Sequence, residues 1–275
     1  MNPANIAFIG CGNMGRCLLG GLLKDGYPAA QLRAADADPL KLDRLSAETG
    51  VRTSSDNLEA VRDADVVVLA IKPQQMRAVA VALAPALSAR RPLIVSIAAG
   101  IRIADLRRWI GPLSIVRAMP NTPALLGCGA AGLYAGEGVS GEQREQAEGI
   151  LRAVGLTVWV ESEALLDAVT AVSGSGPAYF FALMEWIENA GAQLGLSREQ
   201  ARLLTLQTAL GASRMAIESS LDPAALRKQV TSPGGTTERA LAIMNQNDMG
   251  GIVEQALAGA RQRAAEMAAE FGDEK

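Results

Sequence analysis

Two glycine-containing segments, far apart in the chain, have the residue types that bind negatively charged groups. Residues 10–15 read Gly-Cys-Gly-Asn-Met-Gly, and residues 231–241 read Thr-Ser-Pro-Gly-Gly-Thr-Thr-Glu-Arg-Ala-Leu. Glycine lets a ligand approach the backbone closely, and the N–H groups of the first turn of a helix have no partner within that helix. Each segment precedes a predicted helix, so each is suited to presenting free N–H groups to an anion.

The first segment matches the dinucleotide-binding fingerprint Gly-x-Gly-x-x-Gly in the context that the fingerprint requires. It follows the apolar run NIAFI and opens a predicted helix. In this pattern Gly10 permits a tight turn, Gly12 lets the backbone approach the pyrophosphate, and Gly15 lets helix and strand pack closely. A glycine turn without a ligand is the alternative, and the alternating strands and helices that follow favour the dinucleotide site.

The residues do not decide which nicotinamide cofactor binds. Asp36 ends the second predicted strand, where an acidic side chain accepts from the ribose 2′-hydroxyl and favours NAD. Arg33 and Lys41 flank it, and either has the length to reach a 2′-phosphate. The loops at 70–73 and 98–100 follow two further predicted strands, and we expect both to border the cofactor because ligands bind at the carboxyl ends of parallel strands. The lysine of the first loop is equally well explained as a solvated surface side chain.

The chain divides into a part with strands and a part without. The first 160 residues alternate short apolar runs with amphipathic stretches, a pattern typical of a parallel sheet covered by helices. The predicted strands are 5–10, 32–36, 65–71, 93–98, 114–119, 130–135 and 156–160, with helices between them, for example at 13–25 and 75–88. After Glu161, alanine and leucine dominate and helix boundaries recur. We therefore predict an α/β fold, with a Rossmann-type parallel-sheet domain at 1–160 and an all-helical domain at 161–275 for substrate binding and oligomerisation.

Composition excludes several classes of function. The net charge is −3, and no run of Lys and Arg predicts a partnership with nucleic acid or with a membrane surface. The sequence has no histidine, which removes Ser-His triads, histidine proton relays and most zinc sites, so we predict no metal. Three cysteines without ligand or disulfide spacing and the absence of a signal-like N-terminus predict a reduced, cytoplasmic location.

The second segment can be interpreted in two ways. Residues 232–235 predict a turn, after which Thr236 and Thr237 supply hydroxyls and first-turn N–H groups. Such a helix start binds a carboxylate or phosphate without a lysine, but a cap formed by the two threonines explains the same residues. Residues 173–179, Ser-Gly-Ser-Gly-Pro-Ala-Tyr, raise the same question: Pro177 fits a first helical turn, with Ser175 or Gly176 as its cap. Capping does not explain the two glycines, whereas close approach by a ligand or a neighbouring chain does.

These segments together resemble a known family. VTSPGGTTERAL at 230–241, SGSGPAY at 173–179, AIKPQ at 70–74, MPNTP at 119–123 and FIGCGNMG at 8–15 are similar to signature segments of pyrroline-5-carboxylate reductases and occur in that family's order. The resemblance implies reduction of L-1-pyrroline-5-carboxylate to L-proline with NADPH or NADH, the last step of proline biosynthesis. It also implies a homo-oligomer, a dimer or a ring of dimers, built through the helical domain.

The resemblance also implies roles for individual residues. The phosphate loop would comprise Gly10, Gly12, Asn13, Met14 and Gly15, and the further cofactor contacts Asn57, Ala70, Lys72 and Pro73. The substrate would be bound by Ser232, Gly235, Thr236 and Thr237. Thr237 would lie near the imine nitrogen and either donate a proton or orient the ring. One departure concerns Asp36, because many members have Arg or Ser after the second strand and commonly prefer NADPH.

Such a reaction is compatible with a chain that has no histidine. A protonated cyclic imine is already a strong hydride acceptor, so the enzyme needs position more than acid–base power. A 3-hydroxyacid dehydrogenase is an alternative, but such enzymes commonly use a lysine about one helical turn past the glycine loop, and residues 177–190 contain none. A non-enzymatic nucleotide sensor is a second alternative, and it predicts nucleotide binding without turnover.

Overall fold

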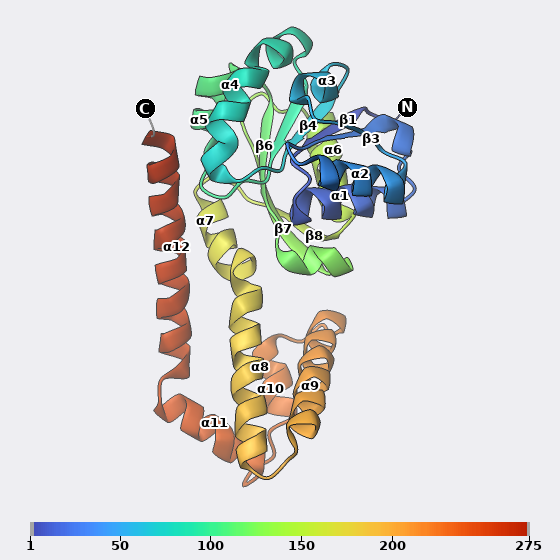
Figure 1. Cartoon of the computed structure of the whole chain (residues 1–275). Helices are drawn as coiled ribbons and strands as arrows, with labels where there is room; N and C mark the ends of the chain where they lie inside the picture. The colour runs from blue at the N-terminus through green and yellow to red at the C-terminus, as the bar shows by residue number, and fades with distance from the viewer. Residues whose placement is uncertain (1–2, 274–275) are drawn as a thin grey trace. The chain divides into compact units, whose positions relative to one another are not determined.

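A computed structural model describes residues 3–273 of the chain. Contacts between residues divide it into two compact units, Met1–Ser175 with Gly259–Lys275, and Gly176–Ala258. We call them the sheet unit and the helical unit. Figure 1 shows the strands of the sheet unit and the helices of the helical unit.

The sheet unit is built on one eight-stranded sheet with the order β3-β2-β1-β4-β5-β6-β7-β8. The strands are β1 (Ile6–Ile9), β2 (Leu32–Ala35), β3 (Arg52–Ser54), β4 (Val66–Leu69), β5 (Leu93–Ser96), β6 (Ile115–Met119), β7 (Gly129–Ala135) and β8 (Gly155–Trp159). All neighbours are parallel except β6 and β7. Only the short 3₁₀ turn η2 (Thr122–Leu126) joins those two strands, too short for the crossover that a parallel pair needs.

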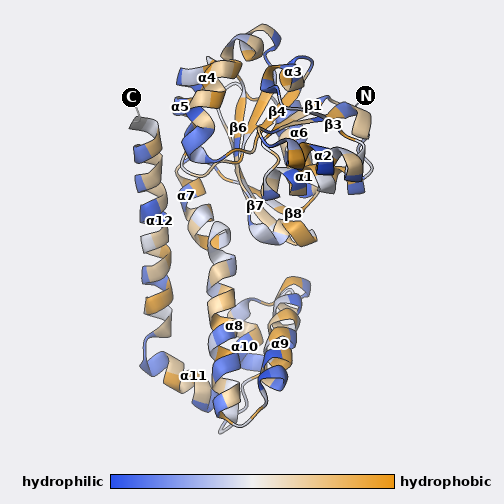
Figure 2. Ribbon diagram, in the orientation of Figure 1, coloured by the Kyte–Doolittle hydropathy of each residue, from blue (hydrophilic) through white to orange (hydrophobic). Residues whose placement is uncertain are grey.

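Helices cover both faces of this sheet, which confirms the predicted α/β fold. The sheet-unit helices are α1 (Asn13–Lys24), α2 (Pro39–Thr49), α3 (Asn57–Val61), α4 (Pro73–Arg90), α5 (Ile103–Ile110), α6 (Gly141–Arg152) and α7 (Leu165–Val169). Alternate residues of β1 enter opposite cores: Ile6 and Phe8 pack with α1, α2 and α6, and Ala7 and Ile9 pack with α3, α4 and α5. Figure 2 shows the central strands, such as β4, in the colours of hydrophobic residues, as expected for strands buried on both faces.

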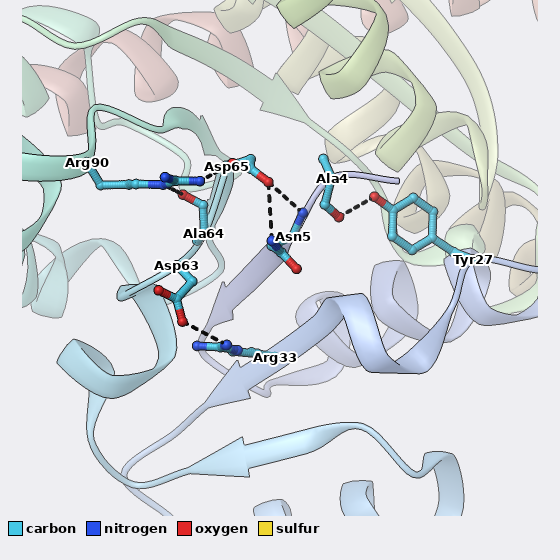
Figure 3. Close-up of polar contacts among 8 residues, drawn as sticks. All are labelled: Ala4, Asn5, Tyr27, Arg33, Asp63, Ala64, Asp65 and Arg90. Carbon is cyan, nitrogen blue, oxygen red and sulfur yellow. Dashed lines mark hydrogen bonds and ion pairs between the residues drawn. The ribbon is translucent and has the colours of Figure 1, made fainter. Parts of the chain in front are cut away.

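Polar contacts tie the amino ends of the strands together (Figure 3). The Asp65 carboxylate accepts from the Asn5 backbone N–H at 2.9 Å and from the Arg90 guanidinium at 2.5 Å, which joins the segments before β1 and β4 to the end of α4. Arg33 on β2 pairs with Asp63 at 3.1 Å. These contacts lie at the edge opposite the glycine loop, so they anchor the sheet and leave its carboxyl edge free for ligands.

The helical unit has helices without strands. It comprises α8 (Gly176–Gln193), α9 (Arg198–Glu218), α10 (Pro223–Gln229), α11 (Thr236–Gln246) and the first part of α12 (Met249–Asp273). Many of its large apolar side chains are exposed, among them Phe180, Phe181, Trp186, Leu194, Leu203, Leu210 and Ile217. A monomer rarely exposes so much apolar surface without a partner.

The two units do not coincide with the predicted domains 1–160 and 161–275. The turns at 165–174 pack on β6 and β7, so the sheet unit extends to Ser175. The end of α12 also belongs to the sheet unit: the Gly272 carbonyl accepts from Arg108 at 2.7 Å, and the loop at Gly100 lies against Met267 and Phe271. The strand β3 was not predicted, because a short edge strand of Arg, Thr and Ser has no apolar pattern.

Candidate functional site

The glycine loop at 10–15 has the close backbone contacts that the fingerprint predicts. Gly10 has φ +100°, and a Cβ placed there would lie 2.5 Å from the Ala70 carbonyl oxygen. A Cβ on Gly15 would overlap the Gly10 carbonyl oxygen. Gly12 is exposed, and a Cβ there would meet no atom within 4 Å. The loop is therefore packed on its inner side by Gly10 and Gly15 and open at Gly12, which fits a bound pyrophosphate.

The remaining cofactor candidates lie at the ends of strands and the starts of helices in the sheet unit. Ala70 donates its N–H to the Ile9 carbonyl at 2.8 Å and forms the wall against Gly10. Pro73 is the first residue of α4, and Lys72 before it is exposed. Asn57 is the first residue of α3. Asn13 and Met14 form the first turn of α1, where N–H groups are free to face an anion.

Asp36 is bound to the glycine loop itself. One of its carboxylate oxygens accepts from the Cys11 N–H at 2.7 Å, and the other accepts from the Asp38 N–H at 3.0 Å. The Lys41 ammonium lies 3.7 Å from both Asp36 and Asp38. Of the two basic residues that flank Asp36 in sequence, only Lys41 accompanies it, because Arg33 pairs with Asp63. The carboxylate therefore both braces the loop and places a negative charge at the carboxyl end of β2.

The thiol of Cys11 contributes no charge to this loop. Burial and, to a lesser extent, the neighbouring Asp36 carboxylate together raise the pKa of Cys11 to about 12. The protonated Sγ lies 3.6 Å from the Ala35 carbonyl oxygen. The loop thus presents N–H groups and no thiolate, which suits a phosphate ligand.

The helix starts differ in whether a side chain caps them. In α2, α6, α9 and α10 a side chain accepts from a first-turn N–H, the capping residues being Asp38, Ser140, Ser197 and Asp222. By contrast, α1, α4 and α11 begin after Gly12, Lys72 and Gly235, and none of these residues accepts from the helix. The helices that follow the two predicted anion-binding segments, α1 and α11, are thus both uncapped. The lack of a cap is not confined to them, because α7 also begins without one, and α3, which begins at Asn57, is capped by Asp56.

The start of α11 is a tight turn followed by two unused threonines. Gly234 has φ +69° and donates its N–H to the Glu238 carboxylate at 2.7 Å, and Gly235 donates to the Ser232 carbonyl at 3.0 Å. Within residues 3–273, neither threonine hydroxyl makes a hydrogen bond to another protein group, so the two threonines do not form a cap. Thr236 is exposed and Thr237 half-buried.

The available donors of this turn follow from these contacts. Arg239 is the first residue of α11 whose N–H reaches a carbonyl, that of Gly235 at 3.2 Å, so the first-turn N–H groups at 236 and 237 stay free. Gly235, predicted to bind substrate, uses its own N–H inside the turn. Its absence of a side chain matters instead, because a Cβ would lie 3.0 Å from the Ser232 oxygen.

The segment 173–179 contains the predicted helix start, since α8 begins at Gly176 and Pro177 lies in its first turn, but the segment before it is itself helical. A π-turn, η3 (Thr170–Gly174), joins α7 to α8 without an intervening cap. At Gly174 the turn lies close to β6, since a Cβ there would lie 2.8 Å from Cε at the end of the flexible Met119 side chain. The close approach predicted for a glycine here is real, but it comes from a side chain of β6. Asn121, which lies in the signature segment MPNTP but was assigned no role of its own from the sequence, is buried beside this turn.

Two absences bear on function within residues 3–273. Among these residues, no group of three or more His, Cys, Asp and Glu side chains could hold a metal ion. Over the same range, no helix is both long and apolar enough to span a membrane.

Comparisons with known proteins give one family across the chain. The family model described as pyrroline-5-carboxylate reductase dimerisation matches residues 163–267, and that described as NADP oxidoreductase coenzyme F420-dependent matches residues 5–100. The pyrroline-5-carboxylate reductase of Pseudomonas aeruginosa is 56% identical over 273 residues, covering 99% of this chain and 100% of that protein. That of Pasteurella multocida is 43% identical, with 97% and 98% covered.

Solved structures agree with these sequence relatives. A pyrroline-5-carboxylate reductase from Coxiella burnetii has a TM-score of 0.94 at 44% identity, covering 97% of this chain and 99% of that one. The Plasmodium falciparum pyrroline carboxylate reductase, solved with NADP bound, has a TM-score of 0.85 at 30% identity, covering 98% and 99%.

Proposed function

The chain belongs to the pyrroline-5-carboxylate reductase family, and we propose how its residues carry out that family's reaction, the reduction of L-1-pyrroline-5-carboxylate to L-proline. The protein is an NAD(P)H-dependent oxidoreductase that acts on a C=N bond in the last step of proline biosynthesis. The observation that carries the proposed site is the start of α11, an uncapped helix at which the hydroxyls of two threonines have no hydrogen-bond partner among residues 3–273.

The cofactor is NADPH or NADH, which when bound supplies a hydride to the imine carbon. We propose that Gly10, Gly12, Asn13, Met14 and Gly15 hold its phosphates, since the open side of Gly12 and the free N–H groups of α1 suit an anion. The loops at 57 and 70–73 contribute further contacts, with the Lys72 ammonium as the only positive side chain among them.

We propose that the substrate carboxylate binds at the start of α11. The N–H groups of Thr236 and Thr237 have no hydrogen-bond partner in the described part of the chain, and the positive end of the helix dipole favours an anion there. The Ser232 hydroxyl and the turn closed by Gly235 complete the site. This arrangement binds a carboxylate through neutral donors, so no positive side chain in it repels the positively charged iminium of the substrate.

The Thr237 hydroxyl is the group proposed to act on the ring nitrogen. The substrate iminium loses its positive charge when the carbon receives hydride, and the resulting amine needs a hydrogen-bond partner rather than a strong base. A threonine hydroxyl can donate to the nitrogen or orient it. No histidine is required for either role, in agreement with the composition.

We propose a cytoplasmic enzyme that assembles as a dimer, or a ring of dimers, through the helical unit. The dimerisation family model covers residues 163–267, which include α8 to α11. The exposed apolar side chains of α8 and α9 are the surface that a second copy would bury, because burial of such area is the main driving force for association.

An absorbance assay tests the function directly. Purified protein is mixed with pyrroline-5-carboxylate and either NADPH or NADH in parallel, and the loss of reduced-cofactor absorbance is followed. We expect turnover with formation of proline. Cofactor binding without turnover of this substrate would instead support a nucleotide sensor and contradict the proposal. The ratio of the two rates also measures the cofactor preference that Asp36 affects.

A further inference from the structure

Asn121 lies just after β6 and connects two distant parts of the sheet unit. Its Nδ2 donates to the Ser173 carbonyl at 3.0 Å, and its Oδ1 accepts from the Ala130 N–H at 2.9 Å. The side chain is buried, with only 9% of its surface exposed. Both ends of the carboxamide are therefore used, and a buried amide of this kind has little freedom to move.

The Ser173 carbonyl belongs to the π-turn η3, and its neighbours in sequence explain why it needs Asn121. The turn is closed by the Ser175 N–H, which donates to the Thr170 carbonyl at 2.8 Å. In a regular helix the Ser173 carbonyl would accept from residue 177, but Pro177 has no N–H. Asn121 supplies the missing donor. Turns of this type are rare and are frequently found at functional sites.

The turn η3 lies at the carboxyl end of β6. A Cβ on Gly174 would be 2.8 Å from the Met119 Cε, so the turn lies against the side chain of the last residue of the strand. Because β6 is parallel to β1, β4 and β5, its carboxyl end lies on the same edge of the sheet as the glycine loop.

The strand order indicates which half of the cofactor this part of the edge receives. Asp36 on β2 marks the adenosine side and the glycine loop after β1 marks the phosphates, so the nicotinamide extends toward the strands on the other side of β1, which are β4, β5 and β6.

We infer that Asn121 is a positioning residue that holds η3 on the carboxyl end of β6 and so fixes the wall beside the nicotinamide half of the cofactor. The inference rests on the proposed function for the identity of the cofactor. In this role Asn121 does not affect binding of the adenosine half of the cofactor. A residue that merely stabilises the fold would affect both halves.

The variant Asn121→Asp tests this role, because it keeps the acceptor for Ala130 and removes the donor to Ser173. We expect kcat to fall about 10-fold or more, since a small misplacement of reacting groups is costly. Binding of ADP-ribose, which lacks the nicotinamide, should change by less than about twofold. Hydrogen exchange should accelerate in residues 170–176 and stay unchanged in residues 6–24. The control Asn247→Asp makes the same charge change at an exposed amide that donates to the Ile243 carbonyl.

A second pair of variants keeps the test decisive if Asn121→Asp folds poorly. Gly174→Ala crowds η3 against Met119 without changing Asn121, and where this shifts η3 we expect a loss of kcat with ADP-ribose binding retained. Adding Met119→Val removes the obstructing Cε and should restore part of the rate.

Two results would overturn the inference. One is a kcat within about twofold of the parent in both Asn121→Asp and Gly174→Ala; the other is parallel loss of kcat and of ADP-ribose binding, which indicates general destabilisation. Failure of the unmodified protein to reduce pyrroline-5-carboxylate would count against the proposed function instead. The hydrogen-exchange measurement would still show whether Asn121 holds η3 in place.

Discussion

The helices α1 and α11 both begin at a glycine without a side-chain cap, but the two starts are made differently. At α1 the glycines are fitted against backbone: Gly10 against Ala70, and Gly15 against the Gly10 carbonyl. At α11 the turn is held by its own local hydrogen bonds, those of Gly234 and Gly235, and Thr236 and Thr237 add hydroxyls that α1 lacks.

This difference teaches what each helix start is suited to bind. A start that offers only N–H groups on a tightly packed loop suits a large, symmetric anion such as a pyrophosphate. A start that adds two hydroxyls has donors and acceptors, so it can bind a carboxylate and also contact a neighbouring nitrogen. The substitutions below are expected to separate these two roles.

The largest effect is expected at Gly15 of α1. In Gly15→Ala the new Cβ overlaps the Gly10 carbonyl oxygen, which is backbone and cannot rotate away, so the loop must shift. We expect loss of saturable NADPH binding in a fluorescence titration. The control is Gly20→Ala in the same helix, where no atom lies within 4 Å of the added Cβ. Full binding by Gly15→Ala would contradict the role of the packed loop.

The substitution Gly12→Ala asks whether the open side of this loop faces the ligand. The added Cβ meets no protein atom within 4 Å, so the melting temperature should not fall. A methyl group there displaces the pyrophosphate, and we expect NADPH affinity to drop about 10-fold, or about 1.4 kcal/mol. If affinity matched that of Gly20→Ala, the phosphates would have to bind elsewhere.

The pair Asp36→Asn and Asp38→Asn tests the charge near the ribose. Both remove one negative charge, and asparagine retains the cap of α2 at position 38. Asp36→Asn should shift the ratio of the two dissociation constants about 10-fold toward NADPH, because a carboxylate close to a 2′-phosphate repels it. Asp38→Asn should shift it far less. Equal shifts, measured by titration with both cofactors, would show that Asp36 has no special position.

A smaller effect is expected at Glu238, which braces the turn before α11. Glu238→Ala removes the acceptor of the Gly234 N–H, and we expect KM for pyrroline-5-carboxylate to rise about 5-fold, in line with one exposed hydrogen bond of about 1 kcal/mol. Glu238→Gln retains an acceptor oxygen and should remain close to the parent. An unchanged KM in Glu238→Ala would mean that the turn needs no brace.

Much of the fold was predictable from sequence, because strands such as β4 are apolar throughout and lie at regular spacing. The antiparallel turn between β6 and β7 and the polar strand β3 were not, since neither leaves a hydrophobic period. The return of α12 to the sheet unit depends on contacts such as those of Phe271 with Gly100, which join residues far apart in sequence.

The candidate site was predictable where backbone geometry restricts residue type, as at Gly10 and Gly15. Asn121 was not, because its role depends on a carbonyl 52 positions away that Pro177 leaves without a partner. The hydrogen bond from the Cys11 N–H to the Asp36 carboxylate could not be predicted from the sequence, although the position of Asp36 at the end of β2 was predicted correctly. Long-range polar contacts have no periodic signature.

The central claim concerns the Thr237 hydroxyl, and a comparison of Thr237→Ala with Thr237→Ser tests it most directly. Rates are measured at saturating NADPH or NADH with pyrroline-5-carboxylate, together with cofactor affinity. We predict that Thr237→Ala lowers kcat about 100-fold while cofactor affinity is retained, and that Thr237→Ser, which keeps the hydroxyl, recovers most of the rate. Near-normal turnover by Thr237→Ala would contradict the account and reduce this residue to a structural part of the helix start.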